Sequence, residues 1–312
     1  MENKSIIITG GAGFIGSHIA DSLVARGDEV VVIDDLSAGK SEFIKPKAKF
    51  VKHDLTDEHI PAEVNAEGSI IFHMAAKPDV RASMEKVAEH HDVDMKTTLN
   101  ILEAARKQDA SAVVFASSSV VYGAAEQIPT PEDAPISPIS FYGLFKAQCE
   151  IMMEFYAMNY GIRTVSIRLA NVIGKRSDHG VIPDFIRKLK DDSSRLEILG
   201  DGKQKKSYVH ISDVVTAFVL AGDSSKKGHT AYNIGTDSLI NVDEIAKIIE
   251  GEMGIAPRHE YKNNLNGKGW KGDITTMLLD TSKARTGLGW NPKTDCASAV
   301  KLAAREVLEG YK

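Results

Sequence analysis

Tyr142 and Lys146 stand four positions apart, a spacing that places a phenol and an ammonium on one face of a helix. An unperturbed tyrosine, with a pKa of about 10, is a poor base at neutral pH. A neighbouring lysine ammonium favours the phenolate and brings its pKa towards a useful range, and a cationic cofactor ring acts in the same direction. The pair therefore predicts a general base, if other segments supply a cofactor and a substrate.

Three consecutive hydroxyl side chains, Ser117-Ser118-Ser119, end an apolar run and are followed by Val120 and Val121. A serine at the end of a strand can hydrogen-bond to an oxygen on which a base acts. Valine cannot take a proton, so no acid follows the serines directly. The segment thus provides hydroxyl groups but no carboxylate.

Residues 9–16 are rich in glycine, follow a strand-like run and open a helical pattern. The glycines permit a tight turn, and the helix that follows offers free N–H groups and its dipole to a pyrophosphate. The next strand ends in Asp34-Asp35, about 20 residues on, where a carboxylate can hydrogen-bond the ribose diol of an adenosine. Because a carboxylate there would repel a 2′-phosphate, NAD is favoured over NADP. Asp54, after the third strand, provides another acid at the same sheet edge, where adenine would lie.

The elements that must position these groups follow an alternating pattern. Apolar, β-branched runs predict strands at residues 5–8, 29–33, 49–52, 69–73, 112–117 and 164–169. Helical periodicity predicts helices at residues 14–26, 87–107 and 142–159. This alternation indicates βαβ crossovers and an α/β fold, a doubly wound parallel sheet of the Rossmann type with both faces covered.

After residue 169 the pattern loosens into shorter elements, with helices predicted at residues 183–190, 242–253 and 298–308. We expect two domains. Residues 1–170 form the NAD-binding domain, and a segment near 207–235 returns to it. Residues 171–312 form a smaller C-terminal α/β lobe that binds the substrate.

Composition excludes several classes of function. The 312 residues are 43% hydrophobic, enough for a large core, and 38 basic against 43 acidic residues give a net charge of −5. This balance predicts no binding of nucleic acid or of an anionic membrane. The apolar run 214–221 is far shorter than the ~20 residues that span a bilayer, and no signal peptide is visible. The cysteines, Cys149 and Cys296, and the histidines show no metal spacing. We expect a cytoplasmic protein without a metal site.

Together these segments resemble the extended short-chain dehydrogenase/reductase family, specifically its nucleotide-sugar epimerases. The resemblance runs nearly end to end and is closest to UDP-galactose 4-epimerases of the archaeal type. The motifs that carry it lie at residues 9–16, 34–39, 73–76, 117–123, 142–146, 168–174, 200–202, 206–208, 208–213, 269–273 and 288–290.

The resemblance implies which serine works and which reaction follows. In this family the working hydroxyl lies three positions before the Val of the Val-Tyr-Gly run, which selects Ser118. At the next two positions, related dehydratases carry Asp-Glu and decarboxylases keep the Glu, while the fucose-forming epimerase-reductases have a cysteine at the first. Here those positions are Ser119 and Val120. The missing acid favours epimerisation at C4, which would interconvert UDP-glucose and UDP-galactose.

In the implied mechanism, the Tyr142 phenolate removes the proton of the sugar's 4-hydroxyl while Ser118 shares that hydrogen bond. A hydride passes from C4 to tightly held NAD. The 4-keto sugar then turns over about its diphosphate link and receives the same hydride on its other face. Lys146 is expected to bridge the nicotinamide ribose and to lower the pKa of the phenol.

The same resemblance implies the binding residues. The cofactor contacts are Gly10, Gly13, Phe14, Ile15, Gly16, Asp34, Asp35, Leu36, Ser37, Ala38, Gly39, Asp54, Leu55, Ala75, Ala76, Lys77, Asn100, Ser117, Tyr142, Lys146, Ala170 and Val172. The substrate contacts are Ser118, Ser119, Tyr142, Asn171, His179, Val181, Phe185, Leu196, Gln204, Lys206, Tyr208, Asp273 and Met277.

Two positions depart from the family pattern, in which Arg often stands where this chain has Lys206 and Trp270. Losing guanidinium forks weakens the planar recognition of phosphate. Charge could come instead from Lys205, Lys206, Lys271 or Arg176, or the lysines could form a solvated basic face. His179 could be an acid or a pocket wall, and we favour the wall.

Met277, four positions after Asp273, is expected to wall the pocket beside the sugar's 2-substituent, unless it is plain core. Its size favours UDP-glucose and UDP-galactose, and its flexibility admits some UDP-N-acetylgalactosamine.

Other functions remain open at this point. The same fold could serve an epimerase of N-acetylhexosamines or pentoses, a sugar reductase that releases NAD(P)H, or an NAD-binding regulator without activity. A homodimer is expected, in which helices 87–107 and 142–159 pair with those of a second copy in a four-helix bundle.

Overall fold

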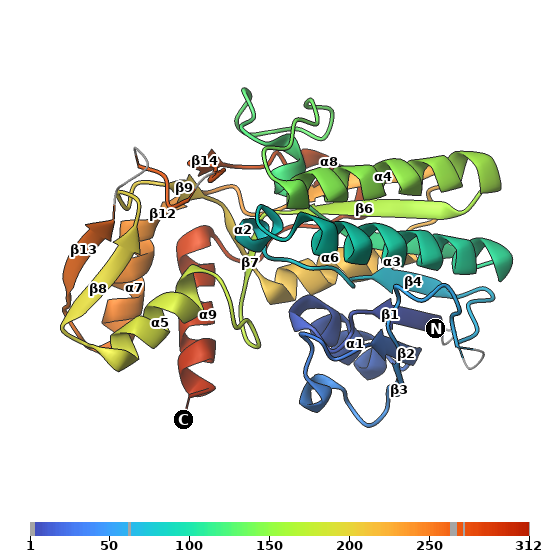
Figure 1. Ribbon diagram of the computed structural model, residues 1–312, viewed down its shortest axis with the longest axis horizontal. Coiled ribbons are helices and arrows are strands. Elements are labelled where there is room, and N and C mark those ends of the chain that lie inside the picture. Colours follow the sequence, from blue (N-terminus) through green and yellow to red (C-terminus); the bar gives the residue numbers. More distant parts are fainter. Residues whose placement is uncertain (1–3, 62–63, 263–266, 271, 312) are drawn as a thin grey trace.

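The computed structural model describes residues 4–61, 64–262, 267–270 and 272–311, and its centre is a seven-stranded parallel sheet (Figure 1). The strand order is β11-β6-β5-β4-β1-β2-β3. The strands are β1 (Ser5–Thr9), β2 (Glu29–Asp34), β3 (Lys49–Lys52), β4 (Ile70–His73), β5 (Ala112–Ser118), β6 (Arg163–Leu169) and β11 (His229–Ile234). The predicted Rossmann-type sheet is therefore confirmed, and β11 adds an edge strand beside β6.

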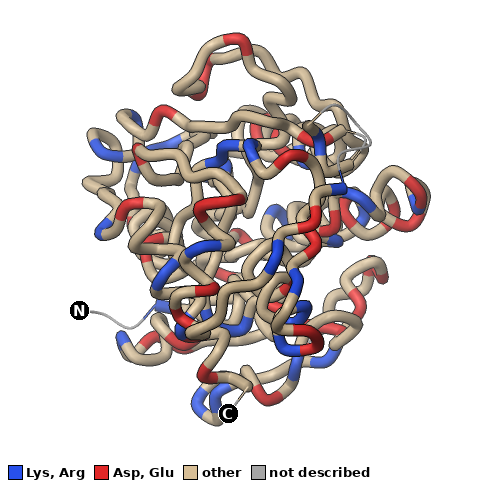
Figure 2. Tube along the Cα trace, turned by 90° about the vertical axis from the view of Figure 1, so that its left-hand side faces the viewer, with Lys and Arg blue, Asp and Glu red and all other residues tan. Residues whose placement is uncertain are grey.

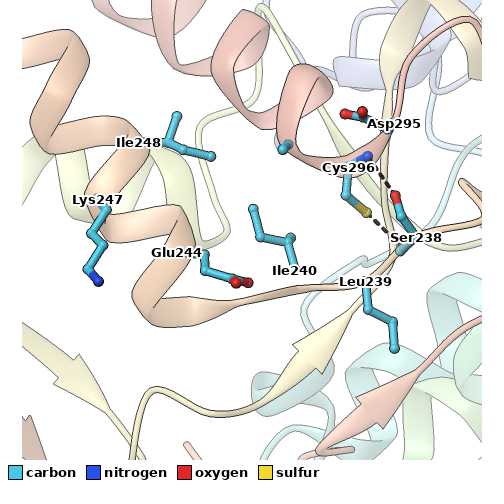
Figure 3. A pocket seen from close by; sticks show the side chains of 9 residues that line it. Ser238, Leu239, Ile240, Glu244, Lys247, Ile248, Asp295 and Cys296 are labelled. Atoms are coloured by element: carbon cyan, nitrogen blue, oxygen red, sulfur yellow. Dashed lines mark hydrogen bonds between the residues drawn. The ribbon is translucent and has the colours of Figure 1, made fainter.

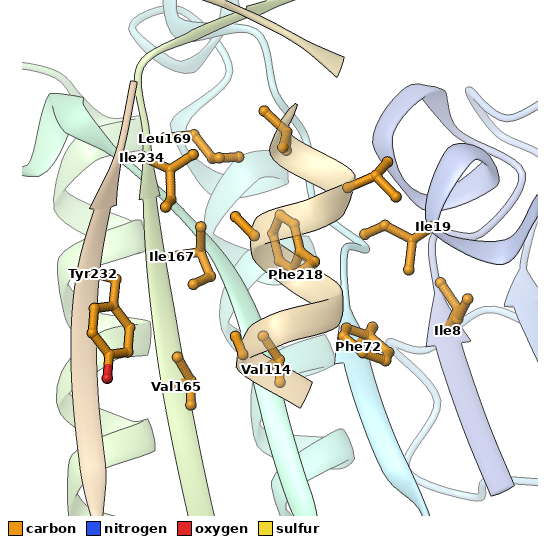
Figure 4. Close-up of a cluster of buried hydrophobic side chains, with 14 of the residues drawn as sticks. Ile8, Ile19, Phe72, Val114, Val165, Ile167, Leu169, Phe218, Tyr232 and Ile234 are labelled. Atoms are coloured by element: carbon orange, nitrogen blue, oxygen red, sulfur yellow. The ribbon is translucent and has the colours of Figure 1, made fainter. Parts of the chain in front are cut away.

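Helices cover both faces of the sheet, which explains why its strands are continuous apolar runs rather than alternating ones. Along β1, Ile6 and Ile8 face one core while Ile7 faces the other. The first core contains α1 (Phe14–Arg26) and α6 (Ile211–Asp223), and Figure 4 shows Phe218 of α6 against the sheet. The second core contains α3 (Val87–Lys107) and α4 (Phe141–Tyr160).

The helix ends follow local chemistry. Helices α1 and α3 begin and end where the sequence predicts. Helix α4 starts one residue earlier than expected because Ser140 caps it, and Gly161, with φ of 72°, ends it. The short helix α2 (Val80–Ser83) and the 3₁₀ turns η1 (Ser41–Phe43) and η2 (Ser119–Tyr122) were not expected, since three or four residues show no periodicity.

The second lobe has its own core, formed mainly by α5 (Val181–Asp191), α7 (Val242–Met253) and α9 (Cys296–Glu309). Strands β8 (Arg195–Leu199) and β13 (Arg258–Lys262) pair in parallel beside them. Strand β7 (Asn171–Ile173) pairs with β10 (Tyr208–His210), and β9 (Lys205–Lys206) lies between β12 (Ile240–Asn241) and β14 (Thr276–Met277). Helix α8 (Ser282–Leu288) packs on the sheet side, against β11 and α6.

Basic and acidic residues are interspersed over the trace (Figure 2). None of the helices in the described residues is both long and apolar enough to cross a membrane.

Candidate active site

The first turn of α4 brings Tyr142 to the end of β5. Ser140 caps the helix by accepting a hydrogen bond from Gly143 N at 3.1 Å. Gly143 itself packs tightly, since a Cβ there would lie 2.7 Å from Val120 O in η2. The Tyr142 N–H donates to Ser83 Oγ at 3.1 Å. Because Gly143 has no side chain, α4 approaches η2 closely enough to place the phenol beside Ser118.

The three serines have different surroundings. Ser118 caps η2 and hydrogen-bonds through its side chain to Tyr142. The Ser117 hydroxyl donates instead to the buried carboxylate of Glu150, which also pairs with Arg168 at 2.6 Å. Ser119 is buried in η2. Of the three hydroxyls, Ser118 is the one that meets the predicted base, whereas the Ser117 side chain serves the Glu150 carboxylate.

Lys146 is buried one turn after Tyr142, with 2% of its surface exposed. Its Nζ lies 5.6 Å from the centre of the Tyr142 ring and 4.6 Å from that of Phe115. His73 on β4 is also buried, and burial lowers its pKa to about 3, with a further lowering by Lys146. Lys146 therefore provides positive charge in a site where the neighbouring imidazole stays neutral.

The ionisation of Tyr142 depends on more than its pairing with Lys146. Burial raises the pKa of Tyr142 above its ordinary value, and the lowering by Lys146 does not outweigh this rise. Asp94 on α3 raises the pKa further, while the hydrogen bond with Ser118 lowers it. The lysine thus acts in the predicted direction, but the protein alone leaves the phenol protonated at neutral pH because ionisation in a buried place is costly.

The glycine-rich turn between β1 and α1 is tightly packed. Gly10 has φ of 63°, and a Cβ on it would lie 2.7 Å from Ala75 N. A Cβ on Gly16 would lie 2.3 Å from Gly10 O. Helix α1 begins after Gly13, without a side-chain cap or an acid in its first turn. The N–H groups of the first turn, at Phe14, Ile15 and Gly16, remain available to an anion, which fits the pyrophosphate of NAD.

Asp34 ends β2 next to this turn. Its two oxygens accept hydrogen bonds from Ala12 N at 2.9 Å and from Leu36 N at 2.8 Å. Lys40 N donates to Ala12 O at 2.9 Å, and a Cβ on Gly39 would lie 2.7 Å from Ala12 Cβ. Residues 34–40 are therefore folded against the glycine-rich turn, and each Asp34 oxygen keeps a further lone pair for a ribose hydroxyl.

The other predicted cofactor residues lie at the carboxyl ends of strands or beside them. Asp35 bonds to Ser37 and Asp54 to Thr56 in tight turns, and Asn100 on α3 donates to Leu55 O at 2.9 Å. The remaining ones occupy the loops after β2 and β4, the position between β6 and β7, and β7 itself: Ala38, Ala75, Ala76, Lys77, Ala170 and Val172. Parallel strands bind ligands at this end of the sheet, which agrees with the predicted placement of the cofactor.

Lys206 is less free than the sequence suggests. Its Nζ lies 2.7 Å from Asp273 Oδ1, and the ammonium sits 5.0 Å from the centre of the Trp270 ring. Asp273, almost fully buried, also accepts from Gly269 N at 3.0 Å. Lys206 is thus part of a buried ion pair rather than a solvated basic face. The alternative cation Lys271 lies outside the described residues.

Several predicted substrate contacts are packing residues. Leu196 has 0% of its surface exposed and Phe185 3%, and both belong to the core of the second lobe together with Tyr208. Leu196 cannot touch a ligand from there, because it presents no surface. Val181 is partly buried against the same core. These side chains support the second lobe by packing in its core or against it.

The remaining predicted contacts are the buried loop residue Gln204, residues on β-ladders and the exposed His179. Asn171 Nδ2 donates to Ser207 O at 3.0 Å, and Gln204 Nε2 to Leu199 O at 3.2 Å. Met277 pairs with Lys206 in the β14–β9 ladder and is partly buried. His179 is exposed and hydrogen-bonds Asp178 Oδ1 at 2.8 Å, and its place as a pocket wall stays a prediction.

A hollow of about 440 Å³ lies elsewhere in the second lobe, between the starts of α7 and α9 (Figure 3). Its walls include Ile240, Ile248 and Cys296, and the Cys296 Sγ lies 2.9 Å from Ser238 O. None of the predicted site residues lines it. Among the described residues, no group of three His, Cys, Asp or Glu side chains is placed to hold a metal ion.

Sequence reasoning missed Asp94, Ser83 and Glu150. Asp94 is buried on α3 and acts on both Tyr142 and Lys146. Ser83 receives the N–H of Tyr142, and Glu150 binds Ser117. Glu150 lies one turn after Lys146 on α4, and this helical spacing could have indicated that it lies near the site. Asp94 and Ser83 lie on other helices and reach the site only through tertiary packing.

Comparison with known proteins assigns the family. The chain matches the NAD-dependent epimerase/dehydratase family over residues 6–235, well over half its length. The chain belongs to this family. The resemblance seen in the motifs is thereby confirmed, and NAD is the cofactor that the family uses, which fits the uncapped start of α1 and the carboxylate of Asp34.

Individual relatives and solved structures are similar to this chain over nearly its full length. UDP-glucose 4-epimerase of Mycolicibacterium smegmatis is 34% identical over 307 residues, which cover 94% of this chain and 95% of that protein. A crystal structure of a UDP-galactose 4-epimerase is 40% identical, with a TM-score of 0.90 and coverage of 99% and 100%. UDP-glucose 4-epimerase from Thermotoga maritima, solved with UDP-glucose, is 31% identical, with a TM-score of 0.88 and the same coverage.

Proposed function

We propose that this protein is a UDP-glucose 4-epimerase, which interconverts UDP-glucose and UDP-galactose by transient oxidation at C4 of the sugar. The observation that carries the proposal is the grouping of Tyr142, Ser118 and Lys146 at the end of β5, with Ser119 and Val120 where an acid pair would stand. The similar proteins with this name, one of them solved with UDP-glucose, support it.

Each residue of this group has a distinct task. When bound, NAD supplies a two-electron acceptor that can return the same hydride. Tyr142 takes the proton of the 4-hydroxyl as that carbon is oxidised and gives it back on reduction. Ser118, hydrogen-bonded to the phenol, orients the 4-oxygen, and the buried Lys146 ammonium stabilises the phenolate. The stretch 118–121 places no carboxylate beside the sugar to remove a further proton or expel a hydroxyl, so the keto sugar is reduced again.

The two domains divide the ligands between them. Residues 1–170, with the segment near 207–235, hold NAD through the glycine-rich turn and Asp34. Residues 171–312 hold the UDP-sugar, with Asn171 near the diphosphate. The Lys206–Asp273 pair offers the substrate a cation whose charge is partly balanced, so phosphate binding draws on further donors such as the backbone.

A second candidate substrate is UDP-N-acetylgalactosamine. Met277 is the residue that we expect to discriminate between the two sugars, because it is only partly buried and lies beside Lys206 in the β14–β9 ladder. Methionine is large enough to crowd an acetamido group and flexible enough to move aside. UDP-galactose is therefore the better substrate, with some turnover of the N-acetylated sugar.

The protein also forms a homodimer in this proposal. Ile151, Phe155 and Met158 on α4 expose more than half of their surfaces. Leu144, also on α4, and Leu99, on the adjacent helix α3, are exposed as well. An apolar helical face of this kind suits the same face of a second copy in a four-helix bundle. The mass of the protein in solution checks this, and Phe155→Glu should shift it from dimer to monomer.

The enzyme acts in the cytoplasm, where its two buried, free cysteines would stay reduced. Incubating the purified protein with a panel of UDP-sugars and separating the products tests the substrate. UDP-galactose should yield UDP-glucose without added NADH or NADPH. A requirement for stoichiometric reduced cofactor would instead identify a reductase.

A further inference from the structure

Arg176 joins the second lobe to the NAD-binding domain. It lies between β7 and α5, and its guanidinium donates to Ser17 Oγ at 3.0 Å and to Asp21 Oδ2 at 2.7 Å. Both partners lie on α1, one turn apart, directly after the glycine-rich turn. The side chains of the ion pair are 14% and 27% exposed, so solvent screens their attraction less than at an open surface.

The same guanidinium contacts the loop that begins at Asp34. Its carbon Cζ lies 5.0 Å from the centre of the Phe43 ring, a distance at which a cation is attracted to an aromatic face. Phe43 ends η1, just after the point where Lys40 N binds Ala12 O of the glycine-rich turn. One side chain of the second lobe therefore reaches both elements that form the cradle for NAD.

The backbone of Arg176 is strained where it makes these contacts. Its φ is 70°, in the left-handed region that residues other than glycine seldom adopt. The preceding residue, Lys175, anchors the segment to α9 by donating its N–H to Glu306 Oε2 at 2.8 Å. A glycine would remove the strain, so the arginine at this position points to a role of its side chain.

We propose that Arg176 is a clasp that holds the NAD-binding domain and the second lobe together and slows the release of NAD. The first turn of α1 and the loop after Asp34 are the elements that fit the pyrophosphate and the ribose, and Arg176 ties both to the second lobe. The inference rests on the proposed cycle, in which NAD is regenerated on the enzyme and need not leave between turnovers.

The rate of NAD release tests the clasp without any measurement of activity. The holoenzyme is loaded with labelled NAD, and exchange against unlabelled NAD is followed in the parent and in Arg176→Ala, which keeps the Cβ and the same backbone. Release should become at least about tenfold faster, because the variant loses two charge-assisted hydrogen bonds and one such bond alone corresponds to about that factor. Asp21→Asn should accelerate release in the same direction but less.

Arg26→Ala is the matched control, because Arg26 ends the same helix and pairs with Asp28 and Asp223 rather than with the second lobe. Its NAD release should equal that of the parent. Arg176→Gly separates retention from folding, since glycine relieves the strained backbone. Its Tm should stay near that of the parent while release still accelerates.

Release from folded Arg176→Ala and Arg176→Gly at the parent rate would overturn the clasp. If the parent purifies without NAD, the proposed cycle with a resident cofactor fails separately. The Kd for added NAD then tests the clasp. A higher Kd for Arg176→Ala supports it, and an unchanged Kd contradicts it.

Discussion

The ammonium of Lys146 lies 5.6 Å from the centre of the Tyr142 ring, yet burial keeps the pKa of this phenol above its ordinary value. The tyrosine and the lysine have the helical spacing of a base and its activator, but one positive charge does not offset the cost of burying a phenolate. A second positive charge beside the phenol would act in the same direction as Lys146. The pKa of the Tyr142 phenol therefore depends on several charges around it rather than on Lys146 alone.

Tyr142→Phe should leave folding and NAD binding intact and lower kcat by about 10² to 10⁴, because it removes a positioned acid–base group. Ser118→Ala should lower kcat to a comparable extent, since its hydroxyl meets the phenol. Ser119→Ala is the matched control and should cost much less, because this serine is buried in η2. Steady-state kinetics with UDP-galactose decides, and a larger loss in Ser119→Ala than in Ser118→Ala would refute the assignment.

Asp94→Asn should shift the pH dependence of kcat/KM to lower pH. Asp94 raises the pKa of Tyr142, so removing its charge lowers that pKa and leaves more phenolate at a given pH below it. The amide oxygen can still accept the Lys77 N–H that Asp94 Oδ1 accepts at 3.0 Å. The acidic limb of the pH profile is the readout.

The control for this shift is Asp92→Asn, on the same helix, where Asp92 is exposed and pairs with Lys96 at 3.2 Å. Its pH profile should match that of the parent. An acidic limb of Asp94→Asn that stays in place, or moves to higher pH, would show that Asp94 does not act on the base.

Lys206→Met should destabilise the protein by about 3 kcal/mol, because it leaves the buried Asp273 carboxylate without its cation. Lys203→Met removes an exposed lysine that pairs with Asp243 and should cost less than about 1 kcal/mol. Urea unfolding measures both. Equal costs would mean that Lys206 belongs to a solvated basic face after all.

The sequence predicts the sheet better than the second lobe, for physical reasons. Strands such as β1 and β5 are buried on both faces and show continuous apolar runs, and α3 and α7 have clear periodicity. Strands β9, β12 and β14 have two residues each, too few to show any period. Their pairing depends on contacts between distant segments.

The same limit applies to the site. Tyr142 and Lys146 share one helix, so their spacing shows their relation directly. Asp94 acts on them from α3, and Arg176 reaches α1 from a segment more than 150 residues away in sequence. The ion pair that occupies Lys206 joins residues 67 positions apart. No local pattern predicts such contacts.

Met277→Ser should raise kcat/KM for UDP-N-acetylgalactosamine relative to UDP-galactose, since a smaller side chain leaves room for an acetamido group. The methionine side chain is larger than that of serine by about two non-hydrogen atoms, and a pocket change of this size corresponds to roughly 10- to 200-fold in discrimination. The ratio of the two kcat/KM values in parent and variant measures the effect. An unchanged ratio would show that Met277 is packing rather than a gate.

The most direct test follows the hydrogen at C4. UDP-galactose carrying deuterium at C4 is incubated with the protein as purified, without added cofactor, and the UDP-glucose formed is analysed by NMR and mass spectrometry. Because the carbon that is oxidised receives its own hydride back, the account predicts UDP-glucose with the deuterium still at C4. Loss of the deuterium to solvent, or product formed only when NADH or NADPH is supplied, would contradict it.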